Sequence, residues 1–173
     1  MCIGLFLIAS LSAMAQDETG QTPPLSTAIP SDSILIHFLE DAGVGISQNN
    51  KVTLITSGKD KFEDLFQAIV EAKHHIHLEY FNFRNDSIGN ELFSLLAQKA
   101  SEGVEVRTIY DAFGNWSNNL PLKKKHLKSL RAKGIEIISF DPLRFPYLNH
   151  IFHRDHRKIA IIDGKVAYTG GMN

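Results

Sequence analysis

Residues 76–110 read IHLEYFNFRNDSIGNELFSLLAQKASEGVEVRTIY, and this stretch predicts two strands joined by a helix. Residues 76–83 are rich in β-branched and aromatic side chains, which favour a strand. Residues 104–110 alternate apolar and polar side chains, which is typical of a strand. Between them, residues 88–101 repeat leucine at helical spacing. A strand, a helix and a second strand in this order predict a parallel pair with a helical connection.

The same alternation of strands and helices continues on both sides of this stretch. Before it, residues 52–56 are a candidate strand, and apolar residues from Phe62 onward recur at helical spacing. After it, residues 122–133 predict a basic helix and residues 135–140 a further strand. We therefore expect an α/β protein whose mostly parallel or mixed sheet is flanked by helices.

A β-hairpin is expected to close the fold. Two apolar runs, residues 158–162 and 166–169, flank an Asp-Gly pair, which is a strong hairpin signal. Because side chains alternate along a strand, His156 and Lys158 share one face, whereas Asp163 belongs to the other face. Asp163 is therefore expected to fix the hairpin turn rather than to contact His156.

The string HRKIAIIDGKVAYTGGMN, residues 156–173, holds the side chains that we expect to carry chemistry. A neutral imidazole such as that of His156 can attack phosphorus at neutral pH. A neighbouring ammonium group can neutralise phosphate oxygens as charge builds in the transition state. A glycine turn lets backbone amides approach a phosphate, and an asparagine side chain can donate one more hydrogen bond. We therefore predict phosphate-binding roles for Lys158, Gly170, Gly171 and Asn173.

Composition and charge limit the possible functions. The 173 residues are 43% hydrophobic and 21% charged, which excludes a wholly disordered or collagen-like chain. The formal net charge is -1 at pH 7, so any phosphate chemistry needs a local site rather than bulk positive charge. Cys2 is the single cysteine, which excludes a disulfide framework, a cysteine-based zinc cluster and a catalytic thiol in the folded part.

The N-terminus carries a short apolar run. Residues 3–13 are too few to span a bilayer as a helix, and Ala13-Met-Ala15 resembles a signal-peptidase site, although no Lys or Arg precedes the run. The alternative is a buried N-terminal helix. We expect residues 1–15 to be a signal peptide or membrane-targeting segment, residues 16–50 a linker with a short helix, and residues 51–173 the folded domain.

Several other polar residues have two readings each. Glu79 shares strand parity with two histidines, so it either orients a histidine or reaches the site, or it is a salt-bridged carboxylate in the core. Asp111 follows a parallel strand, where open α/β sheets bind ligands, but an aspartate there also caps loops. His150, His153 and His156 are spaced as metal ligands on a helix can be. Their stretch lacks a helical apolar face, so we predict no metal site.

The order H-x-K, four residues, Asp and later Gly-Gly-x-Asn resembles the HKD motif of the phospholipase D superfamily. The wider context, about residues 50–173, resembles the first catalytic half of bacterial cardiolipin synthases. H-x-K alone has little specificity, whereas the full string with its upstream blocks is highly specific. The matching blocks are Phe62-Glu-Asp-Leu, His75-Ile-His-Leu-Glu79-Tyr-Phe, Gly103-Val-Glu-Val-Arg107, Tyr110-Asp-Ala-Phe-Gly114, Pro142-Leu-Arg-Phe-Pro146 and Ala167-Tyr-Thr-Gly-Gly-Met-Asn173.

The resemblance implies a role for each residue of the motif. His156 matches the nucleophile that forms a phosphohistidine intermediate, and Asp163 matches a structural aspartate. Lys158 and Asn173 match phosphate-binding residues. The family needs no metal or other cofactor. In the family two HKD motifs meet and the second histidine protonates the leaving alkoxide, whereas this sequence contains one motif.

The implied function is phosphatidyl transfer, in which two phosphatidylglycerols at a membrane surface give cardiolipin. Residues 168–173 resemble a strand and glycine turn that would continue. We therefore expect a truncated chain, whose second HKD half comes from a missing C-terminal region or a homodimer partner. The expected location is the bacterial cell envelope, either associated with the membrane or exported to the periplasm.

The alternatives are an exported dimeric phosphodiesterase or nuclease of the same superfamily, and a non-catalytic half-domain. The loop of residues 141–153 is long, aromatic and rich in proline, so it is expected to form a lid or a substrate wall. This loop and the lack of net positive charge favour a lipid substrate over nucleic acid.

Overall fold

The chain divides into two compact units, with the boundary between Val52 and Thr53. In the first unit, helix α1 (Pro30–Asp41) exposes apolar side chains, among them Ile34 and Phe38. The predicted signal segment, residues 1–15, lies outside the described residues. No helix within the described part of the chain is both long and apolar enough to cross a bilayer. The computed structural model describes residues 30–45, 50–142 and 152–173.

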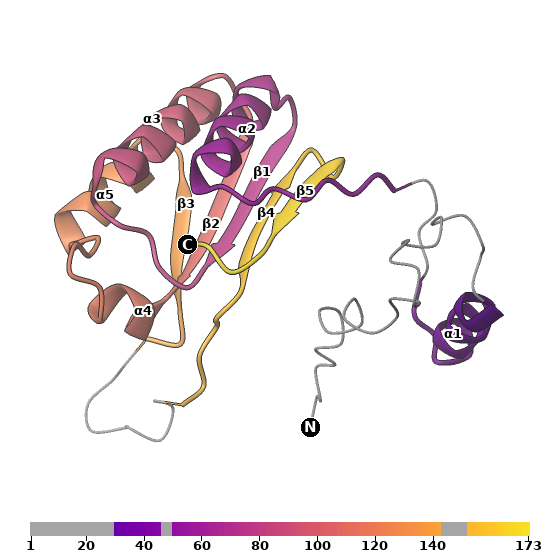
Figure 1. The fold of residues 1–173 in the computed structure, drawn as a ribbon. Coiled ribbons are helices and arrows are strands. Elements are labelled where there is room, and N and C mark those ends of the chain that lie inside the picture. Colours follow the sequence, from indigo (N-terminus) through magenta and orange to yellow (C-terminus); the bar gives the residue numbers. More distant parts are fainter. Residues whose placement is uncertain (1–29, 46–49, 143–151) are drawn as a thin grey trace, which may run out of the picture. The chain divides into compact units, whose positions relative to one another are not determined.

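The second unit is built on a five-stranded mixed sheet with the strand order β3-β2-β1-β4-β5 (Figure 1). Strands β1, β2 and β3 are parallel neighbours, whereas β4 runs antiparallel to both β1 and β5. The strands are β1 (His75–Tyr80), β2 (Glu105–Asp111), β3 (Glu136–Phe140), β4 (Lys158–Ile162) and β5 (Val166–Thr169). The predicted α/β fold and its closing hairpin are confirmed.

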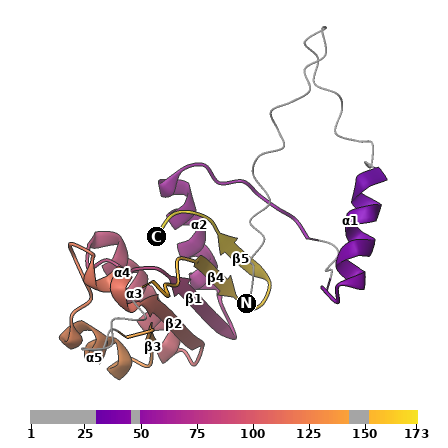
Figure 2. The ribbon, with the colours of Figure 1, turned by 90° about the horizontal axis from the view of Figure 1, so that it is seen from below.

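Helices α2, α3 and α5 lie over the same face of the sheet, as Figures 1 and 2 show together. Helices α2 and α3 each begin after a residue whose side chain accepts a backbone hydrogen bond, Ser57 and Asp86 respectively. Gly103 and Gly134 follow α3 and α5 with φ angles of 91° and 86°, a conformation that ends helices. The helices are α2 (Gly58–Glu71), α3 (Ser87–Ser101), α4 (Ala112–Trp116) and α5 (Lys124–Ala132).

The hydrophobic core lies between the helices and the sheet face that they cover. Ile76 and Leu78 of β1 point into it and are at most 2% exposed, as is Leu96 of α3. No described helix or strand covers the opposite sheet face, where Ile138 is 50% exposed. One face of the sheet is therefore buried, and the other is open within the described residues.

Two local predictions differ from the structure. Residues 52–56 form no strand, because Val52 and Leu54 are 91% and 86% exposed and no described strand pairs with them. Side chains that favour strands form one only where a neighbouring backbone completes the hydrogen bonds. Within residues 30–45 and 50–57, the sheet therefore has no strand. The five-residue helix α4, which the sequence pattern did not predict, starts directly at the end of β2.

Candidate functional site

The predicted catalytic pair lies where the chain enters β4. Lys158 is the first residue of β4 and is 5% exposed, whereas His156, two residues earlier, is exposed. The Lys158 Nζ donates a hydrogen bond of 2.7 Å to the His156 carbonyl oxygen. The Phe81 ring centroid lies 4.8 Å from the centre of the His156 ring and 5.3 Å from the Lys158 Nζ. The structure thus brings the predicted nucleophile and the predicted phosphate-binding lysine to one aromatic ring.

The predicted alternation is confirmed from Lys158 onward, whereas His156 precedes the strand. Lys158, Ala160 and Ile162 are buried on the helix-covered face, while Ile161 on the other face is 36% exposed. Burial lowers the pKa of Lys158, and the negative charge of Asp155 partly offsets this shift. The ammonium group is therefore poorly hydrated, and it bonds to the main chain of His156.

Asn173 lines a recess of about 200 Å³ on the helix-covered side of the sheet. The same recess is lined by Tyr80 of β1, which lies opposite Lys158 in the β1–β4 pairing. Tyr80 therefore lies in the wall of the recess that Asn173 lines and opposite Lys158 in the sheet. Gly170 and Gly171 are exposed, and the space that a side chain would occupy at each is open. That open space leaves room for an anion to approach the backbone there.

Asp163 fastens the β4–β5 hairpin to the start of β1. Its carboxylate accepts hydrogen bonds from three consecutive backbone amides, those of Lys73, His74 and His75, at 2.9, 2.8 and 2.9 Å. These bonds, foremost that from His75, lower the pKa of Asp163 to about 2. Asp163 and Gly164 have φ angles of 53° and 64°, which suit a tight hairpin turn. The geometry gives Asp163 a structural position.

Asp111 is fully buried and holds the segment that precedes His156. Its Oδ1 accepts a 2.9 Å hydrogen bond from the Gly114 amide, which caps α4. The same oxygen accepts a 3.2 Å bond from the Arg154 guanidinium group. Its Oδ2 accepts a 2.9 Å bond from the Asp155 amide. The sequence predicted either ligand binding or capping for Asp111, and the structure shows capping. The same carboxylate also anchors the backbone one residue before His156.

Glu79 lies on the open face of the sheet rather than beside the predicted catalytic pair. Its Oε1 accepts a 3.1 Å hydrogen bond from the Arg157 guanidinium group. Burial and the neighbouring Asp155 raise the pKa of Glu79, while Arg157 opposes the shift. His77, on the same face, pairs with Glu105 at 3.0 Å. Glu79 is therefore salt-bridged as one reading predicted, but it lies on the open face and not in the core.

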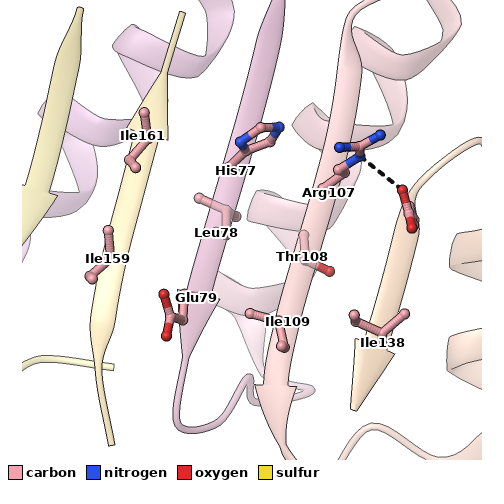
Figure 3. Close-up of a pocket in the computed structure, with 10 residues that line it drawn as sticks. His77, Leu78, Glu79, Arg107, Thr108, Ile109, Ile138, Ile159 and Ile161 are labelled. Carbon is pink, nitrogen blue, oxygen red and sulfur yellow. Dashed lines mark hydrogen bonds and ion pairs between the residues drawn. The ribbon is translucent and has the colours of Figure 1, made fainter. Parts of the chain in front are cut away.

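A wider hollow of about 390 Å³ lies on the open sheet face, where Figure 3 shows the side chains that line it. Near one end of this hollow, Arg107 donates a 3.0 Å hydrogen bond to Glu136. Glu79 is the one predicted site residue in its wall. Sequence reasoning did not identify this hollow, although the alternation along β4 pointed two of its residues away from Lys158. Its apolar residues include Ile109, Ile138, Ile159 and Ile161.

The predicted lid is described only at its two ends. Residues 143–151, which include His150, lie outside the described residues. Phe152 is 93% exposed, and the His153 imidazole lies 3.4 Å from an Asp141 carboxylate oxygen. Across residues 30–45, 50–142 and 152–173, no group of three or more His, Cys, Asp or Glu side chains is arranged to hold a metal ion.

Known proteins resemble most of this chain. Residues 65–173 match the family model described as cardiolipin synthase, PLD-like domain. Over 140 residues the chain is 44% identical to a cardiolipin synthase of Halalkalibacterium halodurans. This alignment covers 80% of this chain and 27% of that enzyme. Over 159 residues it is 38% identical to cardiolipin synthase 1 of Bacillus anthracis. This second alignment covers 89% of this chain and 30% of that enzyme. The chain thus spans less than a third of the length of these relatives.

Among solved structures, NucT from Helicobacter pylori aligns with a TM-score of 0.49 at 21% identity, over 66% of this chain and 67% of that chain. Nuc from Salmonella typhimurium, described as a phospholipase D family member, aligns with a TM-score of 0.47, also at 21% identity. That alignment covers 68% of this chain and 64% of that chain.

Proposed function

Because this chain belongs to the family of cardiolipin synthase PLD-like domains, we propose that it is one catalytic half of a phosphatidyltransferase of the cardiolipin synthase type. The proposed substrates are two molecules of phosphatidylglycerol at a membrane surface. One observation carries the proposal: His156 and Lys158 meet at the Phe81 ring. The recess lined by Asn173 neighbours this pair through Tyr80.

The proposed reaction has two steps through a covalent intermediate. First, the unprotonated His156 nitrogen attacks the phosphorus of one phosphatidylglycerol, and the bond from phosphorus to the glycerol oxygen breaks. Glycerol leaves with a proton from an acid in the second HKD half. A hydroxyl of another phosphatidylglycerol then attacks the phosphohistidine, the P–N bond breaks, and the hydroxyl proton returns to that acid. The products are cardiolipin and glycerol.

Charge stabilisation is the role proposed for the groups around His156. The Lys158 ammonium is poorly hydrated, so it acts more strongly on phosphate oxygens than an exposed lysine would. Backbone amides at Gly170 and Gly171, together with the Asn173 side chain, are proposed to donate the remaining hydrogen bonds to the phosphate.

Two buried or bonded carboxylates are proposed to position this machinery without touching the substrate. Asp111 holds the backbone of Asp155, directly before the nucleophile. Asp163 holds the far end of β4 against the start of β1. Glu79 stays outside this proposal, because its hydrogen bond to Arg157 is on the opposite sheet face.

The general acid is proposed to come from a second HKD half, either in a longer chain or in a second copy of this one. Relatives more than three times as long as the matched segment support the first source. The proposed location is the cell envelope, where phosphatidylglycerol resides, and the apolar run at residues 3–13 supports it.

The test uses the full chain and vesicles that contain phosphatidylglycerol with a radiolabelled phosphate. His156→Ala is expected to abolish the labelled phosphoenzyme and all cardiolipin formation, because the proposed phosphatidyl intermediate forms on this imidazole. The matched control is His153→Ala, which removes an exposed imidazole three residues away. Label that stays on the His156→Ala protein would contradict the assignment of the nucleophile. If two copies form the site, the rate per chain will rise with protein concentration.

A secreted phosphodiesterase or nuclease of the same superfamily is the second candidate, favoured by the apolar run at residues 3–13, which is compatible with export. Plasmid DNA offered in place of vesicles separates the two candidates. DNA cleavage that depends on His156, without turnover of phosphatidylglycerol, would support the nuclease. Vesicle binding without turnover at any protein concentration would instead identify a non-catalytic half-domain.

A further inference from the structure

A second lysine lies beside the recess that Asn173 lines. Lys61, in the first turn of α2, is half-buried, and its Nζ donates a 3.2 Å hydrogen bond to the Tyr80 hydroxyl oxygen. The same Nζ lies 4.1 Å from the centre of the Phe62 ring and 5.0 Å from that of Tyr80. Phe62 and Tyr80 both line the recess. The Lys61 ammonium therefore makes cation–π contacts with two residues of the recess wall.

The charge of Lys61 has no described counter-charge. Among the residues that the structure describes, no carboxylate lies within ion-pairing distance of its Nζ. The nearby carboxylate of Asp64 bonds instead to the Tyr168 hydroxyl at 2.7 Å. Arg84, which also lines the recess, differs because it pairs with Asp86 at 3.4 Å. A half-buried ammonium surrounded by neutral groups has free donors that an anion would satisfy.

Burial affects both members of the Lys61–Tyr80 pair in a way that suits anion binding. It lowers the pKa of Lys61 to about 8, so the amine is still mostly protonated at neutral pH. It raises the pKa of Tyr80 to about 12, so the phenol keeps its proton. The Tyr80 hydroxyl accepts from Lys61 and can donate its own proton to an oxygen in the recess.

The pair also lies next to the proposed catalytic site. Tyr80 and Lys158 are direct partners in the antiparallel β1–β4 ladder, and both side chains are buried on the same sheet face. Tyr80 therefore contacts Lys61 through its hydroxyl and is the strand partner of Lys158. Two cations separated by one tyrosine suit two phosphate groups that must come close together.

We propose that Lys61 and Tyr80 bind the phosphodiester of a second anionic lipid headgroup, beside the phosphate that Lys158 is proposed to hold. This inference rests on the proposed function, because transfer between two phosphatidylglycerols requires a donor and an acceptor phosphodiester in one site. Lys158 and His156 serve the donor, and Lys61 with Tyr80 serves the acceptor.

The experiment compares Lys61→Met with the full-length parent chain. Methionine keeps much of the length and apolar contact of lysine but removes the charge. Lys61→Arg restores a cation, and Lys59→Met removes an exposed lysine from the same helix turn, where it pairs with Glu63 at 3.7 Å. Binding of glycerophosphoglycerol and of inorganic phosphate is measured by calorimetry without turnover. In parallel, hydrolysis to phosphatidic acid and transfer to phosphatidylglycerol are measured on vesicles.

Lys61→Met is expected to weaken glycerophosphoglycerol binding about tenfold, as loss of a charge-assisted hydrogen bond does. Lys61→Arg is expected to recover most of that affinity, and Lys59→Met to bind like the parent. In the kinetic arm, Lys61→Met is expected to raise the KM for the acceptor lipid, whereas Lys59→Met is expected to leave this KM unchanged.

Equal glycerophosphoglycerol affinity in Lys61→Met and the parent would overturn the inference. A loss confined to inorganic phosphate would also overturn it, because the site would then not be built for a phosphodiester. If the chain binds the diester through Lys61 but shows no turnover, the proposed transferase activity fails while the headgroup site stands. If the chain catalyses transfer but its acceptor KM does not depend on Lys61, the proposed headgroup site fails while the proposed transferase activity stands.

Discussion

The carboxylate of Asp163 makes the stability of the second unit depend on pH in a defined window. Its pKa is about 2 in the folded chain and about 3.9 in an unfolded one. A depressed folded pKa contributes stability that is complete above the unfolded value and is lost as the pH falls toward the folded value. Asp163→Asn is therefore expected to destabilise the unit at pH 6, with the difference from the parent shrinking between pH 4 and pH 2.

Urea unfolding at a series of pH values checks this expectation. Glu91→Gln, at an exposed site on α3, is the control and is expected to leave the pH profile unchanged. A stability difference between Asp163→Asn and the parent that stays constant from pH 6 to pH 2 would contradict a role for the ionised carboxylate.

Asp111 provides a second test on a single side chain. Asp111→Asn keeps the shape of the residue but removes the buried negative charge that faces Arg154. Breaking a buried ion pair in this way is expected to lower the free energy of unfolding by about 3 kcal/mol. Asp141→Asn removes the more exposed partner of Arg154 and is expected to cost less. Chemical denaturation measures the free energy of unfolding of both variants. Equal losses in the two variants would show that burial of the carboxylate does not determine the loss of stability.

Helix α4 supports the site through a close approach of two backbones. A Cβ placed on Gly114 would lie 2.1 Å from the carbonyl oxygen of Phe81, whose ring contacts His156. Gly114→Ala must therefore push α4 away from the end of β1. We expect a loss of about 1–3 kcal/mol in unfolding free energy, typical of overpacking, together with reduced phosphoenzyme formation.

The control for this helix is Gly45→Ala, because a Cβ at Gly45 would meet nothing within 4 Å. Thermal unfolding and the radiolabelled lipid assay are the measurements. Full phosphoenzyme formation in folded Gly114→Ala would show that the position of Phe81 does not matter to the site.

Local sequence patterns predicted the elements whose partners are close along the chain. The hairpin at residues 158–169 has its turn signal and both strands within a dozen residues, and its bounds were correct. Residues 52–56 have the same kind of side chains but no neighbouring backbone to bond, which no local pattern reveals. Helix α4 is too short for helical periodicity to indicate it.

The candidate site was predictable to the extent that one strand carries it. The alternation along β4 correctly placed the Lys158 and Ile161 side chains on opposite faces of the sheet. The three amides that bond Asp163 lie about 90 residues away, so no spacing rule could identify them. Lys61 gave no signal either, since a lysine near the start of an amphipathic helix looks like any solvated residue until Tyr80 is placed beside it.

Across the second unit, the two sheet faces differ in what covers them. The helix-covered face holds the core and both lysines of the proposed site. The open face holds the Arg107–Glu136 pair at one end of an isoleucine-lined hollow (Figure 3). The proposed chemistry uses only the first face, which is why Glu79, on the second, has no part in it.

The strand order also has a consequence for biosynthesis. β4 inserts beside β1, although β2 and β3 are translated between them, and the bond from His74 to Asp163 spans 89 residues. On the ribosome, one edge of β1 must therefore wait unpaired while the rest of the parallel sheet assembles. The imidazole reaches its aromatic neighbour only after this late insertion. A nascent chain stalled before residue 156 is thus expected to depend on chaperones that shield open strand edges.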